Sequence, residues 1–205
     1  MELDKAITQR TSIRSFKDTQ IPVDDLKQLV RAGGYAPSVN NYQPWKFYVI
    51  TNKGLMAKMA DLVKEKIEQI PENASKASKN IKSQVEWFAT FFENAPALIA
   101  LTMEEYESVL EKGVDISHTE INIMRNYPDI QSAGAAIQNI LLKAVDMNYG
   151  ACWMSAPMIA KEGLEKLIDV EDPYHLVAFV AVGVPQKDMK PKEKKPLEEI
   201  FKLID

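Results

Sequence analysis

Residues 176–183 (Leu-Val-Ala-Phe-Val-Ala-Val-Gly) form a run that contains no polar side chain. A strand with one face in water alternates apolar and polar residues, whereas a central strand covered on both faces is apolar along its length. The run therefore predicts a central β-strand, which limits the chain to folds in which other elements cover the sheet.

Shorter runs and periodic segments predict the remaining elements. Three further segments have the composition of strands: residues 46–51, 97–101 and 152–154. Apolar residues recur at helical intervals in longer segments between them. These helices are expected at residues 2–9, 23–30, 53–69, 74–94, 129–147 and 161–168. The mixed order of strands and helices, without an internal repeat or a linker, predicts a single α+β domain over residues 1–205.

The segment from Asp129 to Met147 has the strongest helical pattern in the chain. Its apolar residues repeat every three or four positions, and residues 133–136 are all alanine or glycine. Small residues let another backbone approach closely. We therefore expect a helix that packs against several neighbours or lies at a subunit interface.

The pattern weakens between Glu104 and Asn126, where charges of both signs and Gly113 interrupt any sustained period. Long connections of this kind are often functional loops. We expect a lid or a variable insertion over residues 104–128.

The segment Ala36-Pro37-Ser38-Val39-Asn40-Asn41-Tyr42-Gln43-Pro44-Trp45 links a predicted helix, which Gly33 and Gly34 should end, to a predicted strand. Such a connection usually needs only a few residues, and its two prolines fix the backbone φ angle. We interpret it as a shaped binding loop. The alternative is that Pro44 and Trp45 only turn the chain and fill the core.

The chain has a net charge of -4, which gives no general attraction to nucleic acid or to an anionic membrane. Its cations nevertheless gather near both ends, at residues 10–17 and 187–195. These clusters are either solvated tails or two parts of one anion site. No apolar run is long enough for a signal peptide core or a membrane span, so we expect a cytoplasmic protein.

Several kinds of chemistry lack the residues that they need. His118 and His175 are the only histidines and do not form an HExxH motif, so metal catalysis is unsupported. Ser38 is not in a GxSxG turn, and neither a GxGxxG nor a GxxxxGK[ST] loop is present. Cys152, the only cysteine, lies in an apolar run and is expected to be an inert thiol rather than a nucleophile. The aromatic residues at 87–92 have helical spacing, which favours a core or dimer contact over base stacking.

Blocks of residues in a fixed order resemble the nitroreductase family of FMN-dependent oxidoreductases. They are residues 10–16 (RTSIRSF), 36–45, 134–142 (GAAIQNILL), 150–153 (GACW) and 181–200. The resemblance implies a three-layer α+β fold in which helices flank a mixed sheet. It also implies a homodimer with two FMN sites between its subunits.

On this resemblance, the cationic ends of the chain bind the cofactor phosphate. Arg10 and Lys194 would hold the FMN phosphate with help from Lys192, and Ser12 would bond the phosphate or the ribityl chain. Arg14 would approach the N1/O2 side of the flavin ring. Many relatives have arginine in place of Lys194, and lysine offers a point charge instead of a two-pronged donor.

The loop at 36–45 would belong to the same site through the other subunit. Pro37, Ser38 and Asn41 would line the flavin ring and the ribityl chain, and backbone near Ser155 and Ala156 would donate to flavin N5. The full set implied by the resemblance is Arg10, Thr11, Ser12, Arg14, Pro37, Ser38, Asn41, Ser155, Ala156, Lys192 and Lys194.

The resemblance implies an enzyme in which NADH or NADPH reduces FMN and a small acceptor then oxidises it, in a ping-pong cycle. Nitroaromatics and quinones are the usual acceptors in the family. Reductive dehalogenation or flavin-destroying chemistry is an alternative within the superfamily, and a non-catalytic flavin-binding or redox-sensing protein is another. Some relatives place a polar residue against the flavin from the helix before the second strand, where this chain has residues 88–92, which are mostly aromatic.

Overall fold

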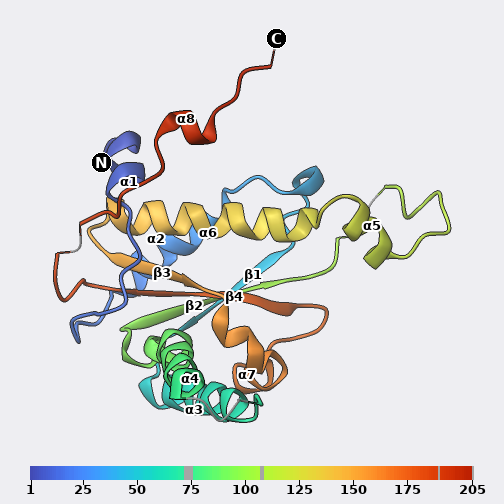
Figure 1. The fold of residues 1–205 in the computed structure, drawn as a ribbon. Helices are drawn as coiled ribbons and strands as arrows, with labels where there is room; N and C mark the ends of the chain where they lie inside the picture. Colours follow the sequence, from blue (N-terminus) through green and yellow to red (C-terminus); the bar gives the residue numbers. More distant parts are fainter. Residues whose placement is uncertain (72–75, 107–108, 189, 205) are drawn as a thin grey trace.

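A four-stranded sheet forms the middle layer of the computed structural model, which describes residues 1–71, 76–106, 109–188 and 190–204 (Figure 1). The strands are β1 (Trp45–Ile50), β2 (Ala97–Met103), β3 (Gly150–Met154) and β4 (His175–Gly183), in the order β1-β2-β4-β3. β2 is buried along its whole length, and β4 along most of it. The prediction of a central strand at 176–183 is confirmed.

Helices cover both faces of this sheet (Figure 1). One face packs against α3 (Lys53–Glu68), α4 (Lys76–Thr90) and α7 (Lys161–Leu167), and the other against α2 (Val23–Gly34) and α6 (Pro128–Asp146). The side chains of β2 alternate between the two cores, because successive residues of a strand point to opposite faces. The three-layer α+β fold expected from the sequence is confirmed.

Strand directions differ in detail from the mixed sheet that the resemblance implies. All the pairings between the four strands are antiparallel. The described residues contain one parallel pairing, the isolated bridge between Ser12 and Ala151, and it does not join two of the four strands. The segment before α2 therefore extends the sheet beyond β3 by a short contact and not by a full strand.

α2 does not end before the two glycines that the sequence suggested as its stop, since both Gly33 and Gly34 lie inside the helix. A Cβ atom on Gly33 would lie 3.0 Å from the side chain of Ile140 and 3.1 Å from that of Phe47. Gly33 therefore allows α2 to pack closely against α6 and β1, and the helix ends at Gly34, so the predicted stop at the two glycines is confirmed.

The region expected to be a lid or an insertion contains a helix that the periodicity did not predict, α5 (His118–Met124). Ser117 and Glu120 form a capping box at its start, in which each side chain bonds the backbone N–H of the other residue. This Ser-x-x-Glu spacing is the sequence signal that could have located the helix. α5 belongs to an arm that projects beyond the sheet (Figure 1).

The remaining elements are short. α1 (Leu3–Gln9) and α8 (Leu197–Ile200) lie near the chain ends, and three 3-10 turns are η1 (Val39–Asn41), η2 (Phe91–Asn94) and η3 (Ala156–Ala160). The helix expected over 74–94 begins at Lys76 and changes into η2 after Thr90, and positions 74–75 lie outside the described residues. Within the described ranges, every helix is too short or too polar to cross a lipid bilayer.

Candidate cofactor site

The segment that carries the first cationic cluster lies extended against β3. The amide of Ile13 donates to the carbonyl of Ala151 at 3.1 Å, and Ser12 forms the parallel bridge with the same residue. A Cβ atom on Gly150 would lie only 2.6 Å from the Ile13 side chain, so the absence of a side chain at Gly150 permits the contact. Residues 10–14 are thereby held on the edge of a rigid sheet.

Ser12 and Arg14 line a cavity of about 310 Å³, which we call the Arg14 cavity. Trp87 and Phe88 of α4 form an aromatic part of its wall, and Lys187 contributes a second cation. The guanidinium carbon of Arg14 lies 5.4 Å from the centre of the Phe88 ring. The cavity therefore combines aromatic and cationic side chains, and none of its lining residues is acidic.

Pairing between two distant segments places Lys187 beside this cavity. The amide of Lys17 donates to the carbonyl of Val184 at 2.8 Å, and the amide of Gln186 donates to that of Ser15 at 3.0 Å. The two cationic ends of the chain therefore meet in the fold, as the interpretation of a single anion site requires.

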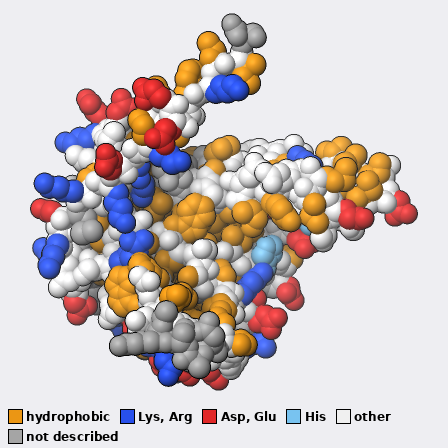
Figure 2. Space-filling model, in the orientation of Figure 1, with side chains coloured by type: hydrophobic (Ala, Val, Ile, Leu, Met, Phe, Trp, Pro, Cys, Tyr) orange, Lys and Arg blue, Asp and Glu red, His pale blue; other side chains and the backbone are white. Residues whose placement is uncertain are grey.

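The cationic side chains that the sequence implicates have no acidic partner in the described part of the chain. Arg10, Arg14, Lys192 and Lys194 form no ion pair with the residues that the structure describes. Figure 2 shows Lys and Arg side chains gathered on the side where α1 and the chain after β4 lie. Half-buried arginines without carboxylate partners favour an external anion at this surface.

Cys152 lies beneath the same segment, with 3% of its surface exposed. Burial raises the pKa of its thiol, although Arg14, Ser12 and Arg10 act in the opposite direction. A protonated buried thiol agrees with the expected inert role.

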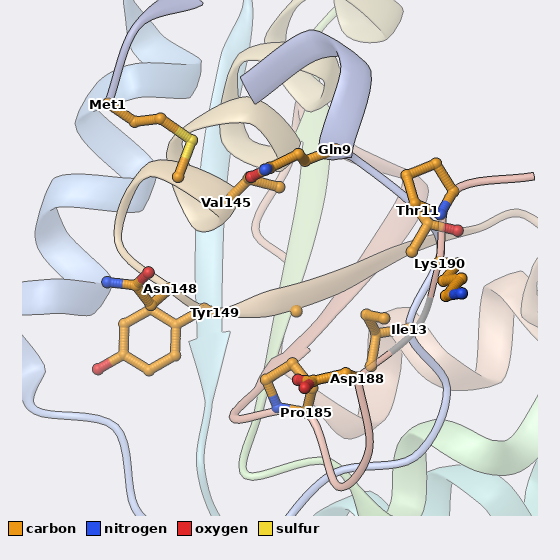
Figure 3. Close-up of a pocket in the computed structure, with 12 residues that line it drawn as sticks. Met1, Gln9, Thr11, Ile13, Val145, Asn148, Tyr149, Pro185, Asp188 and Lys190 are labelled. Atoms are coloured by element: carbon orange, nitrogen blue, oxygen red, sulfur yellow. The ribbon is translucent and has the colours of Figure 1, made fainter. Parts of the chain in front are cut away.

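Thr11 faces a different cavity from Ser12 and Arg14. This second cavity, of about 400 Å³, is also lined by Gln9, Tyr149 and Lys190 (Figure 3). Ile13 lines both cavities, so the two lie on either side of the same extended segment. A cofactor contact by Thr11 stays a prediction.

The loop at 36–44 has an unusual backbone, with several non-glycine residues at positive φ. Asn40, Asn41 and Gln43 adopt positive φ angles of 50°, 55° and 54°. The hydroxyl of Ser38 accepts a hydrogen bond from the amide of Gln43 at 2.9 Å. Asparagine tolerates this backbone region better than most residues, which explains the amide-rich sequence.

Neighbouring residues fix the loop at both ends. The Asn40 side-chain amide donates to the hydroxyl of buried Tyr106, and the rings of Tyr42 and Tyr106 pack edge to face with their centres 5.3 Å apart. Trp45 packs against the core on the α2 and α6 side of the sheet. Pro37 and Asn41 remain exposed, so the loop is fixed while part of its surface is free.

The loop and the arginine segment lie at opposite ends of α6 in one chain (Figure 1). α6 has 19 residues, so it is about 28 Å long at the helical rise of roughly 1.5 Å per residue. The arrangement therefore places the two groups of predicted site residues far apart along α6 within one chain. Ser155 and Ala156, both exposed, follow β3, whose first residues pair with the arginine segment.

The aromatic residues at 87–92 divide between the core and the cavity. Phe91 and Phe92 are buried, which confirms the predicted core contact for these two. In the single chain 53% of Trp87 and 40% of Phe88 are exposed, and both line the Arg14 cavity. The two histidines lie elsewhere: His118 contacts Glu111 at 3.2 Å, and burial lowers the pKa of His175. Across the described ranges, no three His, Cys, Asp or Glu residues are grouped as metal ligands.

Comparison with known proteins agrees with this geometry. A sequence model described as "Nitroreductase family" matches residues 7–184. An iodotyrosine deiodinase from Hydra vulgaris is 27% identical over 98% of this chain and 72% of its own length.

Two solved structures extend the comparison. A BluB-like flavoprotein from Clostridium difficile 630 is 32% identical with a TM-score of 0.89, and covers 100% of both chains. A nitroreductase with bound FMN from Desulfitobacterium hafniense DCB-2 has the same fold, with 19% identity, a TM-score of 0.77 and 100% coverage of both chains. The matched model spans most of the chain, including the arginine segment, the 36–44 loop, α6 and β3, so the chain belongs to the nitroreductase family.

Proposed function

We propose that the protein is an FMN-dependent oxidoreductase that uses NADH or NADPH to reduce a nitroaromatic or quinone-type acceptor. The observation that carries the proposal is the set of unpaired cations held against β3 beside an aromatic cavity. This donor set fits FMN, which combines a dianionic phosphate with a planar aromatic ring.

The residues divide between the two ends of the cofactor. Arg10, Lys192 and Lys194 bind the phosphate, while Ser12 bonds the phosphate or the ribityl chain. Arg14, half-buried in its cavity, lies at the N1/O2 side of the ring.

Part of the site comes from a second copy of the chain. Pro37, Ser38 and Asn41 of that copy line the ring and the ribityl chain. Backbone near Ser155 and Ala156, which follow β3 beside the arginine segment, donates to flavin N5. The separation of the two groups along α6 supports this assignment.

A homodimer also accounts for the apolar end of the chain. The segment after α8 projects from the body in Figure 1, and its large side chains are exposed, including 74% of Leu203 and 83% of Ile204. Exposed apolar residues in such a number indicate a protein interface. Docking against the second copy would bury them.

Bound FMN supplies hydride transfer at N5, and the protein supplies position and electrostatics. The permanent charge of Arg14 stabilises negative charge at N1/O2 and so favours the reduced flavin. Donor and acceptor would use the same open face in turn, which gives ping-pong kinetics.

The test is an absorbance spectrum of the purified protein after incubation with FMN and gel filtration, followed by anaerobic addition of each nicotinamide nucleotide. We expect the protein to retain FMN. One nucleotide should bleach the absorbance of the oxidised flavin, and a benzoquinone added afterwards should restore it. Failure to retain FMN contradicts the proposal. Retained FMN that neither nucleotide bleaches favours the binding or redox-sensing role instead.

Reductive dehalogenation is the second candidate, and the similarity to the Hydra vulgaris deiodinase favours it. The two reactions are separated by offering the reduced protein an iodinated tyrosine and a nitrobenzoate in parallel. Release of iodide, with slower oxidation by the nitrobenzoate, would replace the first candidate by the second.

A further inference from the structure

We propose that Phe88 is a positioning residue, which holds the Arg14 guanidinium against its ring and so keeps this cation in place beside the flavin. The inference rests on the proposed function for the role of Arg14. Its structural basis is the contact between the two side chains.

Among the residues that the structure describes, Arg14 has no acidic partner that could orient it. Its guanidinium carbon lies 5.4 Å from the centre of the Phe88 ring, within the range of a cation–π interaction, and the described residues offer it no ion pair. Cys152 also lies within side-chain hydrogen-bonding reach of Arg14, and the Phe88 ring is the aromatic contact that orients the guanidinium.

Other aromatic residues hold Phe88 in turn. Trp87 meets the Phe88 ring edge to face, with centres 4.8 Å apart and an angle of 78° between the planes. Trp87 also packs against Phe91 at 5.9 Å, and Phe91 is 96% buried, in the core beneath α3 and α4. This aromatic chain links the cavity wall to the core, so Phe88 is restrained although part of it is exposed.

A ring orients a cation without neutralising it. A carboxylate at the same place would also fix Arg14, but its charge would cancel much of the field that an anionic ligand feels. The quadrupole of the ring attracts the guanidinium and leaves its full charge available. Arg14 can therefore favour the reduced, negatively charged flavin more strongly than an ion-paired arginine could.

The first test uses flavin-free protein, so that it does not depend on the proposed function. Phenylglyoxal modifies accessible guanidinium groups, and peptide mass spectrometry gives the rate at Arg14 with Arg10 as internal reference. We expect Phe88→Leu to raise the Arg14 rate about fivefold, since an interaction of roughly 1 kcal/mol is lost. The matched Phe88→Tyr variant, which keeps the ring, should retain the original rate.

The second test measures the ratio of affinities for reduced and oxidised FMN, obtained from the midpoint potentials of free and bound flavin. We expect Phe88→Leu to lower this ratio about fivefold and Phe88→Tyr to restore it. In an Arg14→Gln background, Phe88→Leu should have no further effect, because the ring acts through the arginine.

The outcomes separate this inference from the proposed function. An unchanged Arg14 modification rate in Phe88→Leu overturns the positioning role, whether or not the protein binds FMN. An equal loss of the affinity ratio in the Arg14→Gln background also overturns it, since Phe88 would then act on the flavin directly. If FMN does not bind at all, the proposed function fails, and a raised modification rate still supports the contact between Phe88 and Arg14.

Discussion

Arg10 is the residue on which the proposed phosphate binding should depend most, because it is half-buried and has no acidic partner among the described residues. A hydrogen bond to a charged group contributes roughly 1.5–3 kcal/mol. Arg10→Ala should therefore weaken FMN binding by about ten- to a hundredfold in a fluorescence titration. Arg125→Ala, which removes an exposed cation from the arm, should change little. An unchanged dissociation constant for Arg10→Ala would contradict the phosphate role.

Tyr106 connects the arm to the loop that carries Asn41. Its hydroxyl accepts from Asn40, and a neutral hydrogen bond contributes about 1 kcal/mol. Tyr106→Phe should speed hydrogen exchange of the loop amides and weaken FMN binding by about fivefold. Tyr35→Phe, at a side chain that is 80% exposed, is the control. Unchanged exchange in the loop would show that Asn40 does not need this bond.

The features of the proposed site are visible in the sequence, but their surroundings are not. Clusters of cations near both ends and a loop rich in amides can be identified from the sequence, and the fold pairs residues 15–17 with 184–186. Phe88 could not be assigned, because helical spacing does not reveal whether an aromatic face is covered by the core or open to a cavity. The sequence likewise did not reveal that Thr11 and Ser12 line different cavities.

At the scale of elements, the arginine segment depends on Gly150 of β3. Adding a methyl group there would place a carbon 2.7 Å from Cβ of Ile13, which cannot move without its backbone. Gly150→Ala should lower the free energy of unfolding by about 1–3 kcal/mol and weaken FMN binding as the segment shifts. Chemical denaturation measures the first effect, and FMN titration of the same protein measures the second.

Gly34 provides the matched control for this substitution. A Cβ there would have Trp45 as its nearest neighbour, at 4.0 Å, and alanine favours the helix by about 0.5–1 kcal/mol. Gly34→Ala should stabilise the protein slightly and leave FMN binding unchanged. Equal effects of the two substitutions would contradict the account of Gly150.

The contact between the end of α6 and the N-terminus depends on pH through Asp146. Bonds from Lys143 and from the amino group of Met1 lower its pKa from 3.8 to about 2. Because the folded pKa is depressed, this stabilisation is present above pH 3.8 and is lost as the pH falls toward about 2. Asp146→Asn should therefore show a smaller decline in the free energy of unfolding over that range. Asp24→Asn, at an exposed aspartate of α2, controls for net charge and should retain the full decline.

The longer elements follow directly from periodicity, and the shorter ones do not. β2, β4, α3 and α6 bury long apolar patterns, which dominate their folding. α5 has only seven residues, and its start is set by a capping box, a signal that hydrophobic spacing does not detect.

At the scale of the whole molecule, the proposed site requires two chains, and mixed dimers test this requirement. A chain with Arg10→Ala and a chain with Asn41→Ala should each bind FMN poorly. Unfolding, mixing and refolding the two should restore about a quarter of the sites, because half of the dimers are then mixed and each has one intact site. No recovery, with mixed dimers verified by mass spectrometry, would contradict an intersubunit site.

The three-layer architecture was predictable because one apolar strand requires cover on both faces. The antiparallel order β1-β2-β4-β3 was not, because the sequence of a strand does not specify its neighbours. The projecting end of the chain shows the same limit: its apolar residues are evident in the sequence, but only the fold shows that they lie away from the core of their own chain.

The position of the two half-sites at opposite ends of α6 gives the proposed enzyme a dependence on its own abundance. A chain that has separated from its partner retains one half of each of two different sites and completes neither. Dilution below the dissociation constant of the dimer would then release the cofactor, and added cofactor would oppose that dissociation. Cofactor supply and the amount of protein would therefore set the activity jointly, so that a cell poor in flavin would keep a larger share of this protein as inactive single chains.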